Sequence, residues 1–359
     1  MAKGLEKMDT ATRSGIMILA SAAVIFALYW FRDVLAPFAL AVFLWLVIDG
    51  FSEMIENSLK IIPRWFALTL ALLVVGIGIA VIGVVIIDTA NGMVSNSGAY
   101  ASRLNELVSS AYGAFSTNTP PTVDQLLVRA NPARFLADIA QALQSLTSDA
   151  LFVAVYIGFL FGAQSNFAAK LVAMFPDPEK HANAKALAGS MRLAIEKYLW
   201  VQTVTAAATA FGSWVVMKFV GVDQALFWAF VIFLLNYVPT IGPIIGTVLP
   251  VMFVLVQFET YWQPAIVATG VGFFQFSIGT FLQPRMQGDS MNLSTLVVIL
   301  TLSVWGAIWG IPGMFLSAPL TVMLMMVLAQ FPGTRWIAIL LSMDGHPEKG
   351  LNLDPKPGL

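Results

Sequence analysis

Long apolar runs separated by short polar stretches make up most of this chain. Several runs approach or exceed the roughly 18 to 20 residues that a helix needs to cross a bilayer, and their apolar character is continuous rather than alternating as in a membrane barrel. The pattern predicts an all-α polytopic membrane protein with about eight membrane segments. The first runs are residues 15–31, 34–48 and 65–87, of which the first two are expected to form a tight helical hairpin.

Changes in polarity divide the chain into five expected parts. Residues 88–148 replace the apolar runs with Asn, Ser, Thr and Gln, and their apolar positions recur at helical spacing, which predicts an insert of amphipathic helices outside the membrane. The expected parts are an N-terminal scaffold of three membrane segments (1–88), an extracytoplasmic helical insert (89–148), a membrane helix with a cytoplasmic amphipathic helix (149–199), a membrane core (200–331) and a cytoplasmic tail (332–359).

Two membrane segments of the core are interrupted by proline and glycine. Segments 225–238 and 244–258 flank the break at 236–243, and each reaches only about 21 to 23 Å, which is shorter than the roughly 30 Å hydrocarbon core. A re-entrant hairpin is therefore expected. The second break, 310–313, divides 293–331 into arms of about 26 to 27 Å that fit either two short spans or a second hairpin.

The two breaks follow similar neighbours, since a spanning run precedes each of them. Runs 200–220 and 264–282 come before the interrupted segments and would have opposite senses in the membrane. This outline is typical of inverted-repeat transporters, in which broken helices meet near the midplane and hold a solute. The candidate solute-binding or gating residues are Asn236, Tyr237, Pro239, Thr240, Gly242, Pro243, Gln275, Ser277, Thr280, Gln283, Gly310, Pro312 and Gly313.

Charge is scarce, and this limits the chemistry that the core can perform. The chain is 58% hydrophobic and 11% charged, and its acidic residues lie at or outside the edges of the apolar runs, the nearest being Asp49, Asp88, Asp223, Glu259 and Asp289. No buried carboxylate relay of the kind used by proton-coupled pumps is visible. Neutral polar side chains suit a small uncharged solute that carries hydroxyl groups.

Other classes of function have little support. A net charge of -1 gives no reason to expect nucleic acid, and there is no phosphate-binding loop of the P-loop type. The chain has no cysteine, and His181 and His346 lack the spacing of a zinc site, so we expect no metal, no cofactor and no enzymatic activity. Fourteen of the nineteen Lys and Arg residues fall on one side when both termini are cytoplasmic, which predicts that orientation.

Three motifs together resemble a known family. The run Asn236 to Gly246, the pair Pro284-Arg285, and Trp309 to Met314 with Ala318-Pro319-Leu320 are similar to the autoinducer-2 exporter family of bacterial inner-membrane transporters, as is the stretch Tyr198 to Gln202. The resemblance implies a homo-oligomeric permease of the bacterial inner membrane. Some members are linked to export of autoinducer-2, and others to exchange of sodium or lithium for protons.

The leading hypothesis is a secondary transporter or facilitator whose breaks at 236–243 and 310–313 close over a small polar molecule from opposite sides, with autoinducer-2 as one candidate. A sodium or lithium/proton antiporter is the first alternative, in which Asp223, Glu259 or Asp289 would be drawn inward. The second alternative is a membrane scaffold that transports nothing and binds a partner through its insert.

Overall fold

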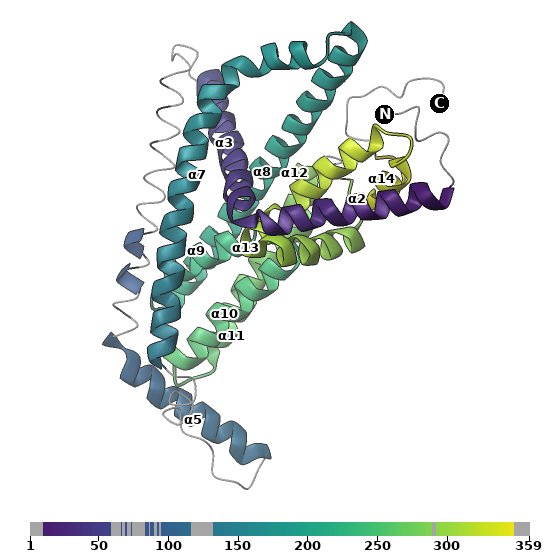
Figure 1. The fold of residues 1–359 in the computed structure, drawn as a ribbon. Coiled ribbons are helices and arrows are strands. Elements are labelled where there is room, and N and C mark those ends of the chain that lie inside the picture. The colour runs from purple at the N-terminus through teal and green to yellow at the C-terminus, as the bar shows by residue number, and fades with distance from the viewer. Residues whose placement is uncertain are drawn as a thin grey trace.

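The protein is a bundle of helices of very unequal length (Figure 1). The computed structural model describes residues 10–58, scattered residues between 66 and 92, and residues 95–115, 132–288 and 292–347. Most of the expected membrane run 65–87 therefore lies outside the described residues. The helices are α2 (Thr10–Trp30), α3 (Arg32–Ser58), α5 (Ser97–Phe115), α7 (Pro132–Met174), α8 (Pro178–Val220), α9 (Ala225–Leu235), α10 (Ile241–Gln257), α11 (Trp262–Ser277), α12 (Gln283–Gln287), α13 (Thr295–Ala329) and α14 (Arg335–Leu341), with a π-helical segment η1 (Ile278–Leu282) between α11 and α12.

Helices α7 and α8 are the longest elements and meet at an elbow. Each has 43 residues, so each is about 64 Å long, roughly twice the hydrocarbon core. At the elbow, the Asp177 side chain accepts a hydrogen bond from the backbone N–H of Glu179 at 3.0 Å, and Pro178 takes the first helical position, where it needs no donor. The amphipathic helix 180–199 and the run 200–220 are thus one continuous helix, which packs against α3, α9, α11 and α13.

The expected tight hairpin at the N-terminus is not formed. Only Phe31 separates α2 from α3, too little chain for the reversal between two antiparallel helices, and Figure 1 shows the two helices crossing at a steep angle. The C-terminal end of α2 is instead held by α13, where Trp309 Nε1 donates to the carbonyl of Leu28 at 3.1 Å.

The first interrupted segment folds as a helical hairpin, as predicted. Helices α9 and α10 pack against each other on either side of the break, and Gly246 of α10 faces Ile232 of α9. Gln257 closes the open end of this hairpin, because its side chain accepts from the N–H of Asp223 at 2.9 Å and donates to the carbonyl of Gly221 at 3.1 Å.

The second interrupted segment also folds back on itself as a pair of packed helical arms, an arrangement open both to two short spans and to a re-entrant hairpin. Helix α13 changes direction at Gly310, whose φ of 64° and ψ of -141° are open to glycine and essentially closed to other residues. Its two halves pack together, since Val297 shares a hydrophobic cluster with Met325, and Trp305 Nε1 donates to Thr321 Oγ1 at 3.2 Å.

Four helices among the described residues are long and apolar enough to cross a membrane by length and composition, namely Arg32–Gly50, Pro178–Val220, Trp262–Gln287 and Thr295–Ala329. The last of these folds back on itself at Gly310 and is therefore not one straight span. These helices confirm the predicted class, an all-α polytopic membrane protein.

Candidate functional site

A polar cavity of about 340 Å³ lies beside α8, where the first break meets the segment that joins α11 to α12. The tip of the first hairpin forms one wall and the π-helical segment forms another, and Asn292, Leu293 and Met343 also belong to the lining. The lining residues are Tyr198, Gln202, Thr205, Ala206, Thr209, Asn236, Pro239, Thr240, Pro243, Gln275, Ile278, Gly279, Gln283, Gln287, Gly288, Asn292, Leu293, Val298, Ala318 and Met343.

The first break is a strained turn. Thr240 has a φ of 65° and a ψ of -55°, and the N–H of Ile241 donates to the carbonyl of Pro239 at 2.7 Å, which is the geometry of a γ-turn of the rare, strained kind. A β-branched residue in this conformation costs on the order of 1 to 3 kcal/mol, and such strain is typical of functional sites. The turn therefore holds the Thr240 side chain and the start of α10 at the cavity wall.

Gly242 has a structural explanation. A Cβ atom added at Gly242 would lie 1.8 Å from the carbonyl oxygen of Leu235, so only glycine lets α10 begin this close to the end of α9. The N–H of Gly242 also donates to the carbonyl of Val238 at 3.0 Å. The sequence-based hypothesis treated Gly242 as a gating residue, whereas its contacts assign it to the fold of the hairpin tip.

The π-helical segment explains how one helix lines the cavity over several turns. Gln275, Gly279, Gln283 and Gln287 are four residues apart, and in a regular α-helix each such step rotates the side chain by about 40° away from the starting face. The wider i→i+5 turn of η1 slows this rotation, so that all four positions reach the same cavity.

Gln202 on α8 connects the walls of the cavity and was missed by the sequence-based prediction. Its Nε2 donates to the backbone carbonyl of Asn236, and its Oε1 accepts from Gln283 Nε2 at 3.1 Å. The sequence showed Gln202 only as part of a family motif at the start of an apolar run. A glutamine within a run of apolar and small residues, at helical spacing from Tyr198 and Thr205, is the signal that could have indicated it.

Several buried polar atoms at the cavity have no hydrogen-bond partner. They are the Tyr198 hydroxyl, Asn236 Nδ2 and Gln275 Nε2, which come from α8, the first break and α11 respectively. Buried polar groups in native proteins nearly always have a partner, and leaving one unpaired costs roughly 1 to 3 kcal/mol.

The described lining residues carry no formal charge, and two of the acidic residues considered for cation exchange lie elsewhere. Asp223 and Glu259 are at the open end of the first hairpin, against α5. There the Tyr100 hydroxyl donates to Asp223 Oδ2 at 2.9 Å, and Arg103 Nη2 donates to the carbonyl of Glu259 at 2.8 Å. Burial raises the pKa of the Tyr100 hydroxyl, and the Asp223 carboxylate also raises it. Asp289 lies outside the described residues.

One acidic residue lies deeper than expected. Asp49 was placed at the edge of an apolar run, but it is fully buried, and its carboxylate is 2.8 Å from Arg192 Nη2 of α8. Gln164 of α7 donates to the same carboxylate at 3.4 Å, and Arg192 also contacts Glu196. This ion pair joins α3, α7 and α8, and a hydrophobic pattern could not show it because the partner lies far away in sequence.

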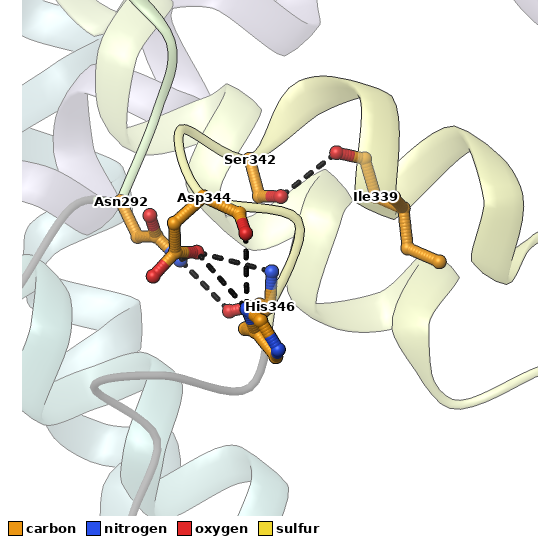
Figure 2. Close-up of polar contacts among 5 residues, drawn as sticks. All are labelled: Asn292, Ile339, Ser342, Asp344 and His346. Atoms are coloured by element: carbon orange, nitrogen blue, oxygen red, sulfur yellow. Dashed lines mark hydrogen bonds and ion pairs between the residues drawn. The ribbon is translucent and has the colours of Figure 1, made fainter.

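The C-terminal strap, residues 342–347, lies across one end of the cavity. Asn292 and Met343 both line the cavity, and the N–H of Met343 donates to the carbonyl of Asn292 at 2.9 Å. Figure 2 shows Asn292 beside Asp344, with its Nδ2 donating to Asp344 Oδ1 at 2.9 Å and to the carbonyl of His346 at 2.8 Å. His346, which was considered as a metal ligand, is thus part of a turn that holds the strap.

The structure brings together only part of the predicted site. The candidates that line the cavity are Asn236, Pro239, Thr240, Pro243, Gln275 and Gln283. Tyr237 lies next to it, with its hydroxyl 2.7 Å from Thr203 Oγ1 and its ring stacked on Phe315 of α13 at 5.9 Å. Ser277 and Thr280 are not among the lining residues, although they belong to the helix that forms the wall.

The second break does not lie at the cavity. Gly310, Pro312 and Gly313 are at the tip of the second hairpin, which packs on α2 and α3 through Ile308 and Trp309. The second interrupted segment contributes Leu293, at its start, and Val298 and Ala318, in its arms, to the lining of the cavity. The expectation that both tips close over one solute from opposite sides is therefore not what the structure shows.

Long apolar helices, two helical hairpins and a polar cavity whose described lining carries no charge define a polytopic membrane protein of the transporter class. A sequence model of the AI-2E family transporters matches residues 18–333. The chain therefore belongs to the AI-2E transporter family and is a membrane protein, which confirms the family resemblance of its motifs.

Individual relatives agree with this assignment. The chain is 28% identical over 334 residues to a Haemophilus influenzae protein whose name records an inferred transport role, and the match covers 90% of this chain and 95% of that protein. It is 36% identical over 148 residues to the AI-2 transport protein TqsA of Escherichia coli K12, which is 41% of this chain and 43% of TqsA. The match to YhhT of the same organism, also named for an inferred transport role, is 37% over 157 residues and covers 44% of each chain.

Proposed function

We propose that this protein is a secondary transporter or facilitator that moves a small, uncharged, polar molecule through the cavity beside α8. The observation that carries the proposal is a cavity whose described lining consists of neutral side chains, three of which, Tyr198, Asn236 and Gln275, also carry a buried polar atom without a hydrogen-bond partner. Burying a charged solute there without a partner would be costly. The neutral polar side chains of the lining can instead replace the hydrogen bonds that an uncharged solute leaves in water.

Autoinducer-2 is the first solute to test. TqsA, which matches part of this chain, is named as an AI-2 transport protein, and a small oxygen-rich molecule fits the chemistry of the lining. The proposal includes a bacterial inner-membrane location with both termini cytoplasmic, a homo-oligomeric assembly, and residues 200–331 as the transport core. Residues 1–88 would act as scaffold and residues 89–148 as an external insert.

Flux of autoinducer-2 into sealed proteoliposomes tests the proposal. Asn236→Asp is the sharpest variant, because it keeps the shape of the side chain and the backbone bond to Gln202 while replacing the unpaired amino group with a negative oxygen. We expect at least a tenfold loss of flux, because the variant loses a hydrogen-bond donor and buries an unpaired charge. Thr269→Val on the exposed face of α11 is the matched control, since its hydroxyl bonds only its own helix.

Other outcomes would overturn the proposal in favour of a stated alternative. Sodium or lithium flux that follows a proton gradient, with none for autoinducer-2 or small polyols, would indicate an antiporter. If no solute moves under any gradient, and deletion of 92–147 abolishes the cellular phenotype, a scaffold that binds a partner through its insert would explain the protein better.

A further inference from the structure

Gln202 lies on α8 at the point where three walls of the cavity meet. Its side chain is only 6% exposed, and both ends of its amide are used. Nε2 donates to the backbone carbonyl of Asn236 at the end of α9, and Oε1 accepts from Gln283 at the start of α12. One side chain therefore links the first break to the helix on the opposite side of the cavity.

The direction of this hydrogen-bond chain is determined by chemistry. A backbone carbonyl can only accept, so Gln202 must turn its amino group toward Asn236. Its carbonyl oxygen then faces Gln283, which must donate. The last carbonyls of a helix have no intrahelical donor, and Gln202 supplies one for Asn236. Replacing Gln202 with an apolar residue would leave this buried carbonyl and the Gln283 amide without these partners.

We propose that Gln202 is the positioning residue of the cavity: its two hydrogen bonds hold the first break against α8 and α12, and a solute passes only when they open. This inference rests on the proposed transport function for its meaning, but the hydrogen-bond chain can be tested without any solute.

A single cysteine can report the opening, because the chain has none of its own. Gly279 lines the cavity, and a Cβ atom added there meets nothing within 4 Å, so Gly279→Cys is a suitable reporter. Its labelling by a membrane-impermeant maleimide is compared with and without Gln202→Leu. We expect labelling to be roughly fivefold faster or more in the double variant, about the factor that one hydrogen bond contributes to an equilibrium.

The matched control is Ser213→Ala in the same reporter background. Ser213 is also on α8, is fully buried, has an unpaired hydroxyl and does not line the cavity. Loss of this hydroxyl should leave the labelling rate unchanged. An equal rise with Ser213→Ala and with Gln202→Leu would mean that any buried polar change in α8 loosens the bundle, and would overturn the proposal.

Gln202→Glu provides a readout that a purely structural role would not produce. The protonated acid can still donate to Asn236 and accept from Gln283, whereas the carboxylate can only accept. Burial raises the pKa of such a group into an accessible range. Among the described residues near the site, the titratable and charged groups are Tyr198 in the lining, Tyr237 behind the break, Arg285 on α12, Lys197, whose Nζ approaches Gly288, and Asp344 and His346 of the strap that binds Asn292. All of them are also present in the Gln202 parent, so comparison with the parent at each pH removes their contribution.

The expected result is that Gln202→Glu labels like the Gln202 parent at about pH 5.5 and several-fold faster at about pH 8, relative to the parent measured at each pH to correct for thiol ionisation. A ratio that does not change with pH would overturn the proposal, as would Gln202→Leu labelling at the parent rate. Since the pH change is made on one folded sample, poor folding of Gln202→Leu does not remove the test. Absence of autoinducer-2 flux in the unaltered protein would instead count against the transport function.

Discussion

Gly242→Ala is predicted to destabilise the protein through the tip of the first hairpin. The added methyl group would lie 1.8 Å from the carbonyl oxygen and 2.7 Å from the carbonyl carbon of Leu235, both of which are backbone atoms that no rotamer change can move. Relief requires α10 to move away from α9 by about 1.7 Å, given a normal contact distance of roughly 3.5 Å. That movement would break the bond from the Gly242 N–H to Val238.

The expected loss is about 1 to 3.5 kcal/mol. Overpacking in a well-packed region costs roughly 1 to 3 kcal/mol, and a lost backbone hydrogen bond adds about 1 kcal/mol. The gain in helix propensity from glycine to alanine recovers about 0.5 to 1 kcal/mol. The control is Gly279→Ala, also at the cavity, where the new Cβ meets nothing within 4 Å.

Thermal unfolding in detergent, followed by tryptophan fluorescence, measures the difference between the two variants. We expect the midpoint of Gly242→Ala to fall by several degrees below that of Gly279→Ala, and the latter to stay at or above the unaltered protein. Equal midpoints would refute the contact argument. A drop confirms it and means that a loss of transport in Gly242→Ala would report a distorted turn rather than a blocked path.

Other contacts predict effects at a distance from the break. Tyr100→Phe removes the hydrogen bond to Asp223 that holds α5 on the first hairpin. Folding raises the pKa of the Tyr100 hydroxyl, so the unfolded state loses this proton first as the pH rises above about 10. The unfolding midpoint of Tyr100→Phe should therefore lie below that of the unaltered protein at pH 7, and this difference should shrink above about pH 10. A gap that stays constant to pH 11 would contradict this. Asn292→Ala should release the C-terminal strap, so proteolytic cleavage within residues 342–347 should become faster while the thermal unfolding midpoint changes little. Cleavage at an unchanged rate would refute the role of this side chain. Asp49→Asn should lower the free energy of unfolding by less than the roughly 3 to 5 kcal/mol lost when a fully buried ion pair is broken. The loss is smaller because Arg192 is 35% exposed and keeps its contact with the Glu196 carboxylate. An unfolding midpoint equal to that of the unaltered protein would argue against a stabilising role of the pair.

The hydrophobic pattern predicted the elements better than their arrangement. The break at 236–243 was visible because prolines and a glycine interrupt apolar sequence, and the hairpin followed from the shortness of its arms. The steep crossing of α2 and α3 was not visible, because run lengths show where helices lie along the chain but not the angle between them. The continuity of α8 was hidden for a related reason, since the change from polar to apolar near residue 200 marks a change of surroundings and not a change of backbone.

The candidate site was only partly predictable because the sequence shows which side chains are polar but not which of them meet. Gln275 and Gln283 were found as polar residues in an apolar run. Their common direction depends on the π-helical segment, whose residues Ile278 to Leu282 look like any other apolar turn. Gln202 was overlooked because its importance comes from the Asn236 carbonyl, 34 residues away. A search for polar side chains cannot reveal a backbone carbonyl that a helix break leaves without an intrahelical donor.

The two hairpins share a composition but not a role, and their surroundings explain the difference. The tip of the first hairpin ends beside polar side chains of α8 and α12, where an unpaired amide on Asn236 and a strained Thr240 are kept at a cavity. The tip of the second hairpin is anchored by Trp309 to the carbonyl of Leu28, and its glycine at 313 packs against its own helix. Proline and glycine thus mark where a membrane helix can reverse, while the neighbouring helices decide whether the reversal encloses a polar space. An inverted-repeat pattern in sequence is therefore compatible with a single solute site beside one of the two hairpins.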